Sequence, residues 1–335
     1  MLVAAQVIAA LLILFLASDA FTNAVEWIGA LRGLTRSAVG AVVAAIGSSL
    51  PDTVVTLIAI VFLRDAASHS IGIGAVIGAP LMLTTLVLAL AGIIALVKFR
   101  NTDRLIDLPL QAVKFGLVLF SATFALVLGA SFAASKPLHY AVAILALGAY
   151  AAYLAYHFRQ KLVEAEEQPP PLRLYPRASR PALWLVAVQL GLALLVTVQA
   201  SRWFIAALGK ASLSVGLPPF LVSVILTPIA TELPEAMNVV IWMRRGLSEL
   251  SISNVLGAMM FQTSIASSIA MFFTPWKLDA YAYAGGGGAL AAALLVLISI
   301  KIKGRLDARV LALCGVFYVA YLVYVLGAAV ARAAT

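Results

Sequence analysis

Apolar residues fill ten long stretches of the chain, and short polar intervals separate them. The stretches cover residues 2–31, 36–63, 68–97, 109–131, 138–158, 182–206, 217–244, 249–275, 280–302 and 308–331. About 20 mainly apolar residues are enough for a helix to cross a bilayer. Apolar side chains surround each stretch instead of alternating between two faces, which favours helices over a lipid-facing barrel. The pattern therefore predicts an all-α polytopic membrane protein with about ten transmembrane helices.

Composition agrees with this class. Of 335 residues, 63% are hydrophobic and 11% are charged, whereas soluble domains carry about 25% charged residues. The N-terminus is apolar from Leu2 to Leu16 without a basic leader, so a retained first helix is expected rather than a cleaved signal peptide. Cys314 is the single cysteine and excludes an intramolecular disulfide.

The net charge of +9 raises the question of nucleic acid, but the placement of the charges indicates a membrane orientation. With the N-terminus outside, sixteen Lys and Arg residues fall in connections on the inner side and six on the outer side. This asymmetry satisfies the positive-inside rule. We expect both termini outside and no nucleic-acid surface.

The longest polar interval, residues 159–181, divides the chain into two halves. We expect a first five-helix repeat at 1–158, a cytoplasmic linker at 159–181 and a second five-helix repeat at 182–335. Five helices per half force the second half to insert upside down, which is an inverted repeat. Two gapless alignments support the division: Ala38–Asp52 with Leu221–Glu235, and Gly74–Ala79 with Ser253–Ala258.

Each half contains one copy of a polar, proline-containing motif inside an apolar stretch. Ser48-Ser49-Leu50-Pro51-Asp52 returns as Thr231-Glu232-Leu233-Pro234-Glu235. Within a helix each proline frees a backbone carbonyl, and the hydroxyl and carboxyl side chains share one helical face with it. Oxygen-rich sites of this kind suit hard cations such as Na⁺ or Ca²⁺. The alternative is that these small polar residues only kink the helix.

Carboxylates are rare in the apolar stretches, and an acid in hydrocarbon is by default a candidate for an ion or proton path. Asp19 and Glu26 are expected to face water near a helix end, with an access path as the alternative. Asp52, Glu232 and Glu235 lie in the middle of their stretches. Since Glu232 and Glu235 are three residues apart, both cannot stay ionised without a cation or a shared proton. Competition between a divalent cation and protons or Na⁺ follows.

These motifs resemble the Ca²⁺/cation antiporter superfamily, which includes the sodium/calcium exchangers. The resemblance implies ten helices in two inverted repeats and exchange of cation for cation by alternating access. It also implies that Ser48, Ser49, Asp52, Thr231 and Glu235 stand where that family binds its ions. Asn254 matches the later family motif, and Gln262 supplies a further amide.

The chain also departs from the family pattern. Asp52 replaces a glutamate, Glu232 replaces a serine, and Ala75, Ala79 and Pro80 stand where the first repeat has amide or hydroxyl residues. The first half has thus lost most of its later ligands. Fewer bound ions than in the exchangers, or proton coupling, is the hypothesis that follows.

The resemblance implies a secondary active transporter and not an enzyme. No resident cofactor is expected, and the expected partners are inorganic cations (Ca²⁺, Na⁺ or H⁺) and the lipid bilayer. The second-repeat motif is typical of a bacterial branch, which places the chain in a bacterial or archaeal cell membrane. A cation channel, a non-transporting membrane sensor and an intramembrane aspartyl-type protease stay open as alternatives.

Overall fold

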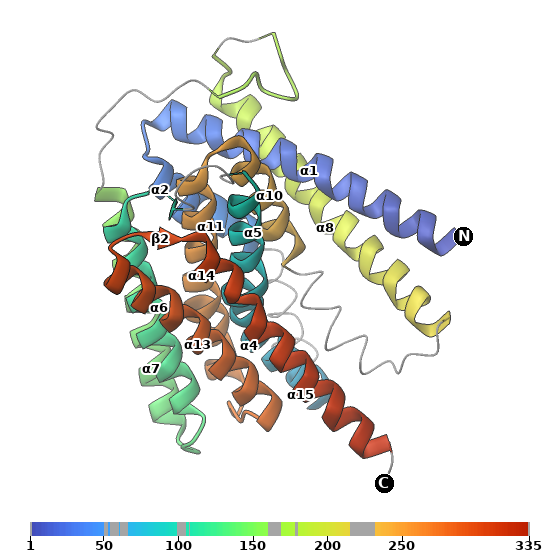
Figure 1. Ribbon diagram of the computed structural model, residues 1–335, viewed down its shortest axis with the longest axis vertical. Helices are drawn as coiled ribbons and strands as arrows, with labels where there is room; N and C mark the ends of the chain where they lie inside the picture. The colour runs from blue at the N-terminus through green and yellow to red at the C-terminus, as the bar shows by residue number, and fades with distance from the viewer. Residues whose placement is uncertain are drawn as a thin grey trace.

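The computed structural model describes residues 2–49, 53, 60, 66–98, 105–106, 108–159, 169–177, 180–214 and 232–333. Helices dominate this part of the chain (Figure 1). The first half contains α1 (Leu2–Arg32), α2 (Arg36–Ala38), η1 (Val39–Ala44), α4 (Ala66–Met82), η3 (Leu83–Val87), α5 (Leu88–Lys98), β1 (Leu105–Ile106), α6 (Leu110–Ala130) and α7 (Lys136–Arg159). The second contains α8 (Leu183–Ser214), α10 (Leu233–Arg245), α11 (Ser248–Phe261), η4 (Gln262–Ala266), α12 (Ser267–Phe273), α13 (Ala280–Lys303), β2 (Leu306–Asp307), α14 (Ala308–Leu313) and α15 (Gly315–Ala333).

The helix boundaries confirm the predicted all-α polytopic class. Eight helices of the described residues are long and apolar enough to cross a membrane. The predicted stretches 36–63 and 217–244 are described only in part, so the count of ten and the inverted repeat stay predictions. Apart from helix, the described residues form one two-stranded antiparallel ladder, in which Leu105 of β1 faces Asp307 of β2.

Two helices, one made of α4, η3 and α5 and the other of α11, η4 and α12, are called the central helices and share a local distortion. The π-helical turn η3 interrupts the run from α4 to α5, and η4 interrupts the run from α11 to α12. Leu83 and Gln262, which begin these turns, are separated by the same 179 residues as Gly74 and Ser253 in the second sequence alignment. The structural correspondence therefore extends beyond the aligned sequence blocks.

The helix that leads to the first motif crosses α11 with backbone against backbone. A Cβ atom on Gly40 of η1 would lie 2.4 Å from the carbonyl oxygen of Leu250, and one on Gly257 of α11 would lie 2.2 Å from that of Ala41. Real Cβ atoms do not approach so closely, so both positions require glycine. This crossing fixes the first motif against the second half.

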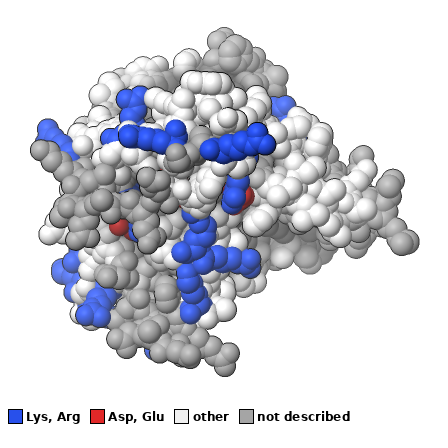
Figure 2. Space-filling view, turned by 90° about the horizontal axis from the view of Figure 1, so that it is seen from above, with Lys and Arg blue, Asp and Glu red and all other residues white. Residues whose placement is uncertain are grey.

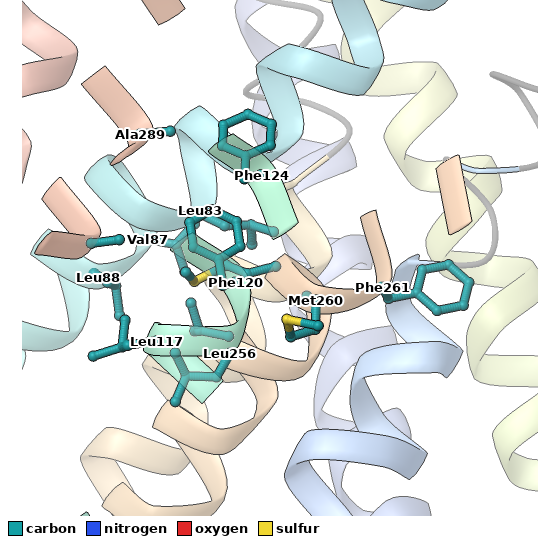
Figure 3. Close-up of a cluster of buried hydrophobic side chains, with 14 of the residues drawn as sticks. Leu83, Val87, Leu88, Leu117, Phe120, Phe124, Leu256, Met260, Phe261 and Ala289 are labelled. Carbon is teal, nitrogen blue, oxygen red and sulfur yellow. The ribbon is translucent and has the colours of Figure 1, made fainter. Parts of the chain in front are cut away.

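Large apolar side chains from both halves fill the space around the central helices (Figure 3). Phe120 and Phe124 of α6 are fully buried, with ring centroids 5.4 Å apart. Leu83 of η3 and Met260 of α11 are also fully buried in this cluster. The polar residues of the central helices are thereby enclosed by apolar side chains.

Helices α1 and α8 lie side by side and extend away from the remaining helices (Figure 1). The described linker residues 169–177 dock against this pair. The indole Nε1 of Trp27 donates to the carbonyl of Pro170 at 2.9 Å, and Leu172 is fully buried against Trp27 and Val186. This part of the predicted linker is therefore packed onto the protein.

Lys and Arg side chains gather on one end of the molecule (Figure 2). Contacts at this end join inner-side connections of the sequence prediction: the Lys98 Nζ donates to the carbonyl of Arg244 at 2.9 Å, and β1 pairs with β2. A basic end is the arrangement that the positive-inside rule requires. The direction of the chain across the membrane stays a prediction.

Candidate functional site

The first motif is described up to Ser49. Ser48 and Ser49 lie in the helical residues that follow η1, and both are buried. The Ser48 hydroxyl donates to the carbonyl of Ala44 at 2.9 Å. Two predicted site residues, Asp52 and Thr231, lie outside the described residues.

Ser49 and Glu235 bring the two motifs together. The Ser49 hydroxyl donates to the Oε1 atom of Glu235 at 3.0 Å, across 186 positions of sequence. Ser49 is fully buried and Glu235 is 1% exposed. The hydroxyl of the first repeat motif thus touches the carboxylate of the second inside the protein.

Both glutamates of the second motif lie at the start of α10. Glu232 is the residue before the helix, with non-helical backbone angles, and is 1% exposed. Pro234 lies in the first turn, where a missing N–H breaks no helical bond. The amino end of a helix attracts negative charge, so α10 offers the carboxylates favourable surroundings despite their burial.

The two predicted amide ligands lie on the central helix that runs from α11 through η4 to α12. Asn254 is buried in α11 at the η1 crossing, where a Cβ on Gly40 would approach its backbone nitrogen to 3.0 Å. Gln262 is buried at the first position of η4. The side-chain amide of Asn254 forms no hydrogen bond with another described residue, so no direct bond joins it to Glu235.

Further buried polar residues were not among the sequence candidates. Thr84 and Thr85 lie in η3, and Thr263 and Ser264 occupy the same positions in η4. Extending the second alignment by six residues would have paired them, because the 179-residue offset continues. Asn238 of α10 is also buried, and its signal is the spacing of one helical turn from Glu235.

The prediction that Glu26 faces water is wrong. Its side chain is 7% exposed, and its carboxylate accepts hydrogen bonds from the Trp242 indole and the Arg245 guanidinium, each at 2.8 Å. Asp19 is more exposed and pairs with Arg173 at 2.8 Å. Arginine partners therefore account for both acids, which tie α1 to α10 and to the linker.

The chemistry of the buried groups is that of oxygen ligands. Among the described residues, no three His, Cys, Asp or Glu side chains are grouped to hold a metal ion. Buried carboxylates lie instead at the start of α10, buried amides lie on α11 and η4, and the Ser49 hydroxyl bonds to Glu235. Oxygen atoms of these kinds are the ligands that hard cations prefer.

Comparisons with known proteins agree on one fold. The sequence model of the sodium/calcium exchanger protein family matches residues 2–159 and 185–328. A solved structure of the sodium-calcium exchanger NCX_Mj, soaked with 2.5 mM Na⁺ and 10 mM Sr²⁺, has a TM-score of 0.74 at 19% identity, over 95% of this chain and 97% of that chain. The same exchanger soaked with zero Na⁺ and Ca²⁺ has a TM-score of 0.74 at 18% identity over the same shares. No curated protein sequence matches the chain.

Proposed function

Because the chain belongs to the sodium/calcium exchanger protein family, we propose that it exchanges Ca²⁺, or another cation, for Na⁺ or H⁺ by alternating access. Family membership and fold make it an integral membrane cation exchanger and not an enzyme. We further propose which two ions are exchanged, which residues bind them and how the protein moves them across the membrane.

The contact between Ser49 and Glu235 carries the proposal. It joins the two repeated motifs at 3.0 Å in a buried position. A cation held there touches both halves of the chain at once, which is the geometry that alternating access needs. Movement of one half relative to the other then changes the side from which the ion is reached.

The proposed ligands are the eight residues that the sequence indicates. They combine carboxylates, hydroxyls and amides: Ser48, Ser49, Asp52, Thr231, Glu232, Glu235, Asn254 and Gln262. Calcium takes six to eight oxygen ligands. Three carboxylates also exceed the charge of one divalent ion, so protons or Na⁺ are needed to balance the rest.

Exchange, as opposed to a leak, follows from the acids. Carboxylates crowded in a low dielectric cannot all stay ionised when no cation is bound. Release of Ca²⁺ therefore requires uptake of Na⁺ or protons at the same groups. This obligation favours countertransport over a channel.

We assign the rest of the architecture in the same way. The two five-helix repeats are residues 1–158 and 182–335, with the linker 159–181 and the basic end on the inner side of a bacterial or archaeal cell membrane. Both termini then lie outside. Labelling of single cysteines at either end in intact cells tests this orientation.

The function is tested by Ca²⁺ uptake into proteoliposomes that contain the purified protein. Uptake is measured under an outward Na⁺ gradient and, separately, under an outward proton gradient. Glu235→Gln removes the proposed ligand charge. Asp279→Asn is the matched control, because Asp279 is an exposed acid at the start of α13.

We expect gradient-driven uptake in the wild type and in Asp279→Asn, and none in Glu235→Gln. Uptake under Na⁺ alone identifies sodium as the counter-ion, and uptake under protons alone identifies H⁺. Ca²⁺ movement that needs no counter-ion contradicts exchange and indicates a channel. Absence of movement of any cation leaves a sensor as the remaining function.

A further inference from the structure

Four buried hydroxyls of the first half donate to the backbone carbonyl four residues before them. The Thr53 hydroxyl donates to the carbonyl of Ser49 at 3.0 Å, and that of Thr84 donates to the carbonyl of Pro80 at 2.7 Å. Ser48 and Thr85 bond in the same way. Their donors are used within the protein.

A second set of buried polar groups lies on α10, α11 and η4. Four side chains without a hydrogen-bond partner among the described residues are Asn238, Asn254, Thr263 and Ser264, and each is at most 1% exposed. A buried polar group without a partner costs free energy. In a native protein, such groups are expected to bind an ion or a water molecule.

Asn238 is the member of this set closest in sequence to Glu235. It lies three residues after Glu235 within α10, and both side chains are 1% exposed. Side chains three apart on a helix are neighbours, with Cβ atoms about 5–6 Å apart. Cation–oxygen bonds of about 2.3–2.6 Å allow one ion to bind a carboxylate and an amide oxygen at that separation.

We propose that Asn238 is a further cation ligand that acts together with Glu235 and sets the preference between divalent and monovalent ions. This inference rests on the proposed function. The neutral amide adds an oxygen without adding charge. Since charge count tunes the affinity of calcium sites, an asparagine here keeps the binding of Ca²⁺ weak enough for release.

A purely structural asparagine is the competing explanation, and the chain contains one for comparison. Asn23 of α1 is equally buried, but its amide donates to the carbonyl of Pro170 at 3.0 Å and accepts from the backbone N–H of Arg173 at 3.1 Å. Removing such an amide breaks bonds. Removing the amide of Asn238 breaks none that is described.

The test compares Asn238→Leu, Asn238→Asp and Asn23→Leu in purified protein. Binding of Ca²⁺ and Na⁺ is measured by calorimetry, and the melting temperature is measured with and without each ion. Exchange is measured in proteoliposomes with the same samples. Binding and exchange are thus read separately.

For Asn238→Leu we expect a melting temperature, measured without ions, at or above that of the wild type. We expect its Ca²⁺ affinity to be weaker by about tenfold or more. Asn238→Asp restores binding and raises the ratio of Ca²⁺ to Na⁺ affinity. Asn23→Leu lowers the melting temperature and keeps the affinities. Together these results support the ligand assignment.

Unchanged Ca²⁺ and Na⁺ affinity in Asn238→Leu overturns the inference and leaves a bound water as the partner of the amide. A lower melting temperature with unchanged affinity also overturns it, in favour of a structural role. A third outcome separates the two proposals. If the wild type binds cations but does not exchange them, and Asn238→Leu binds them more weakly, the proposed function is refuted and Asn238 is still a ligand.

Discussion

The hydroxyl of Ser49 donates to the carboxylate of Glu235, so that a serine of the first repeated motif holds a glutamate of the second. The two residues come from helices that meet only after the chain has folded. The contact sets the position of one carboxylate oxygen in the buried site. Substitutions at this contact and at contacts elsewhere in the protein test what each contributes.

Ser49→Ala removes this hydrogen bond and one hydroxyl ligand. We expect Ca²⁺ affinity to fall about tenfold, because a hydrogen bond to a charged group is worth about 1.5–3 kcal/mol. The matched control is Ser268→Ala, because Ser268 is a buried serine outside the proposed ligands and its hydroxyl donates to the carbonyl of Ala143; its affinity should stay unchanged. Equal affinities in wild type and Ser49→Ala, measured by calorimetry, would contradict this role.

Glu232→Ser leaves one carboxylate at the start of α10. Proton competition with Ca²⁺ should then depend less steeply on pH, because one group titrates in place of a coupled pair. The slope is obtained from Ca²⁺ uptake measured between about pH 5.5 and about pH 8.5. An unchanged profile means that the two glutamates do not act together.

Glu26→Gln should destabilise the protein by about 2 kcal/mol, because the buried carboxylate accepts charge-assisted bonds from Arg245. The Trp242 indole keeps an acceptor in the amide. Denaturant unfolding in detergent measures the change. Arg245→Gln should cost a similar amount, and the double variant should cost less than the sum. Additive costs would show that the pair is not coupled.

Gly257→Ala should lower stability by about 1–3 kcal/mol or more, as overpacking does, because the new methyl group would lie 2.2 Å from the carbonyl of Ala41. The matched control is Gly287→Ala in α13, where nothing lies within 4 Å of the added Cβ. Alanine there should stabilise the helix slightly. Melting temperatures of the two variants check the contrast.

Asp307 predicts an acid-dependent loss of stability outside the membrane-spanning helices. Burial alone would raise the pKa of Asp307, but hydrogen bonds from Lys303 and the Arg309 backbone outweigh it and lower the pKa below the usual 3.8. The stabilisation is present above that usual value and is lost as pH falls through the lower pKa of the folded state.

Asp307→Ala tests this contribution. The substitution should cost about 1 kcal/mol at neutral pH, because Asp307 caps α14. The difference in melting temperature between wild type and variant should shrink as the pH falls below 3.8. A difference that is constant with pH would mean that the carboxylate charge contributes nothing.

The sequence predicts the helices well because length and apolar composition decide membrane insertion. The boundaries of α6 and α13 differ from the predicted stretches by one residue at most. Pairing between helices is not encoded in this way. That Ser49 meets Glu235 depends on the crossing of η1 and α11, which the glycines permit but do not specify.

Glu26 shows where sequence reasoning fails for a physical reason. An acid near the end of a long apolar helix is normally placed in water, and its partner Arg245 is 219 positions away. Only the fold brings the two charges together. The π-helical turns were missed for a related reason: backbone hydrogen bonding carries no residue-type signature in η3 or η4.

Each π-helical turn holds one residue more than an α-helical turn would accommodate. Rewinding η4 as regular α-helix with no residue removed would rotate α12 by about 100° about its axis. Ser268, whose hydroxyl now donates to the carbonyl of Ala143 in α7 at 3.0 Å, would then turn away from its acceptor. The winding of each π-helical turn therefore sets which side chains the following helix presents to its neighbours.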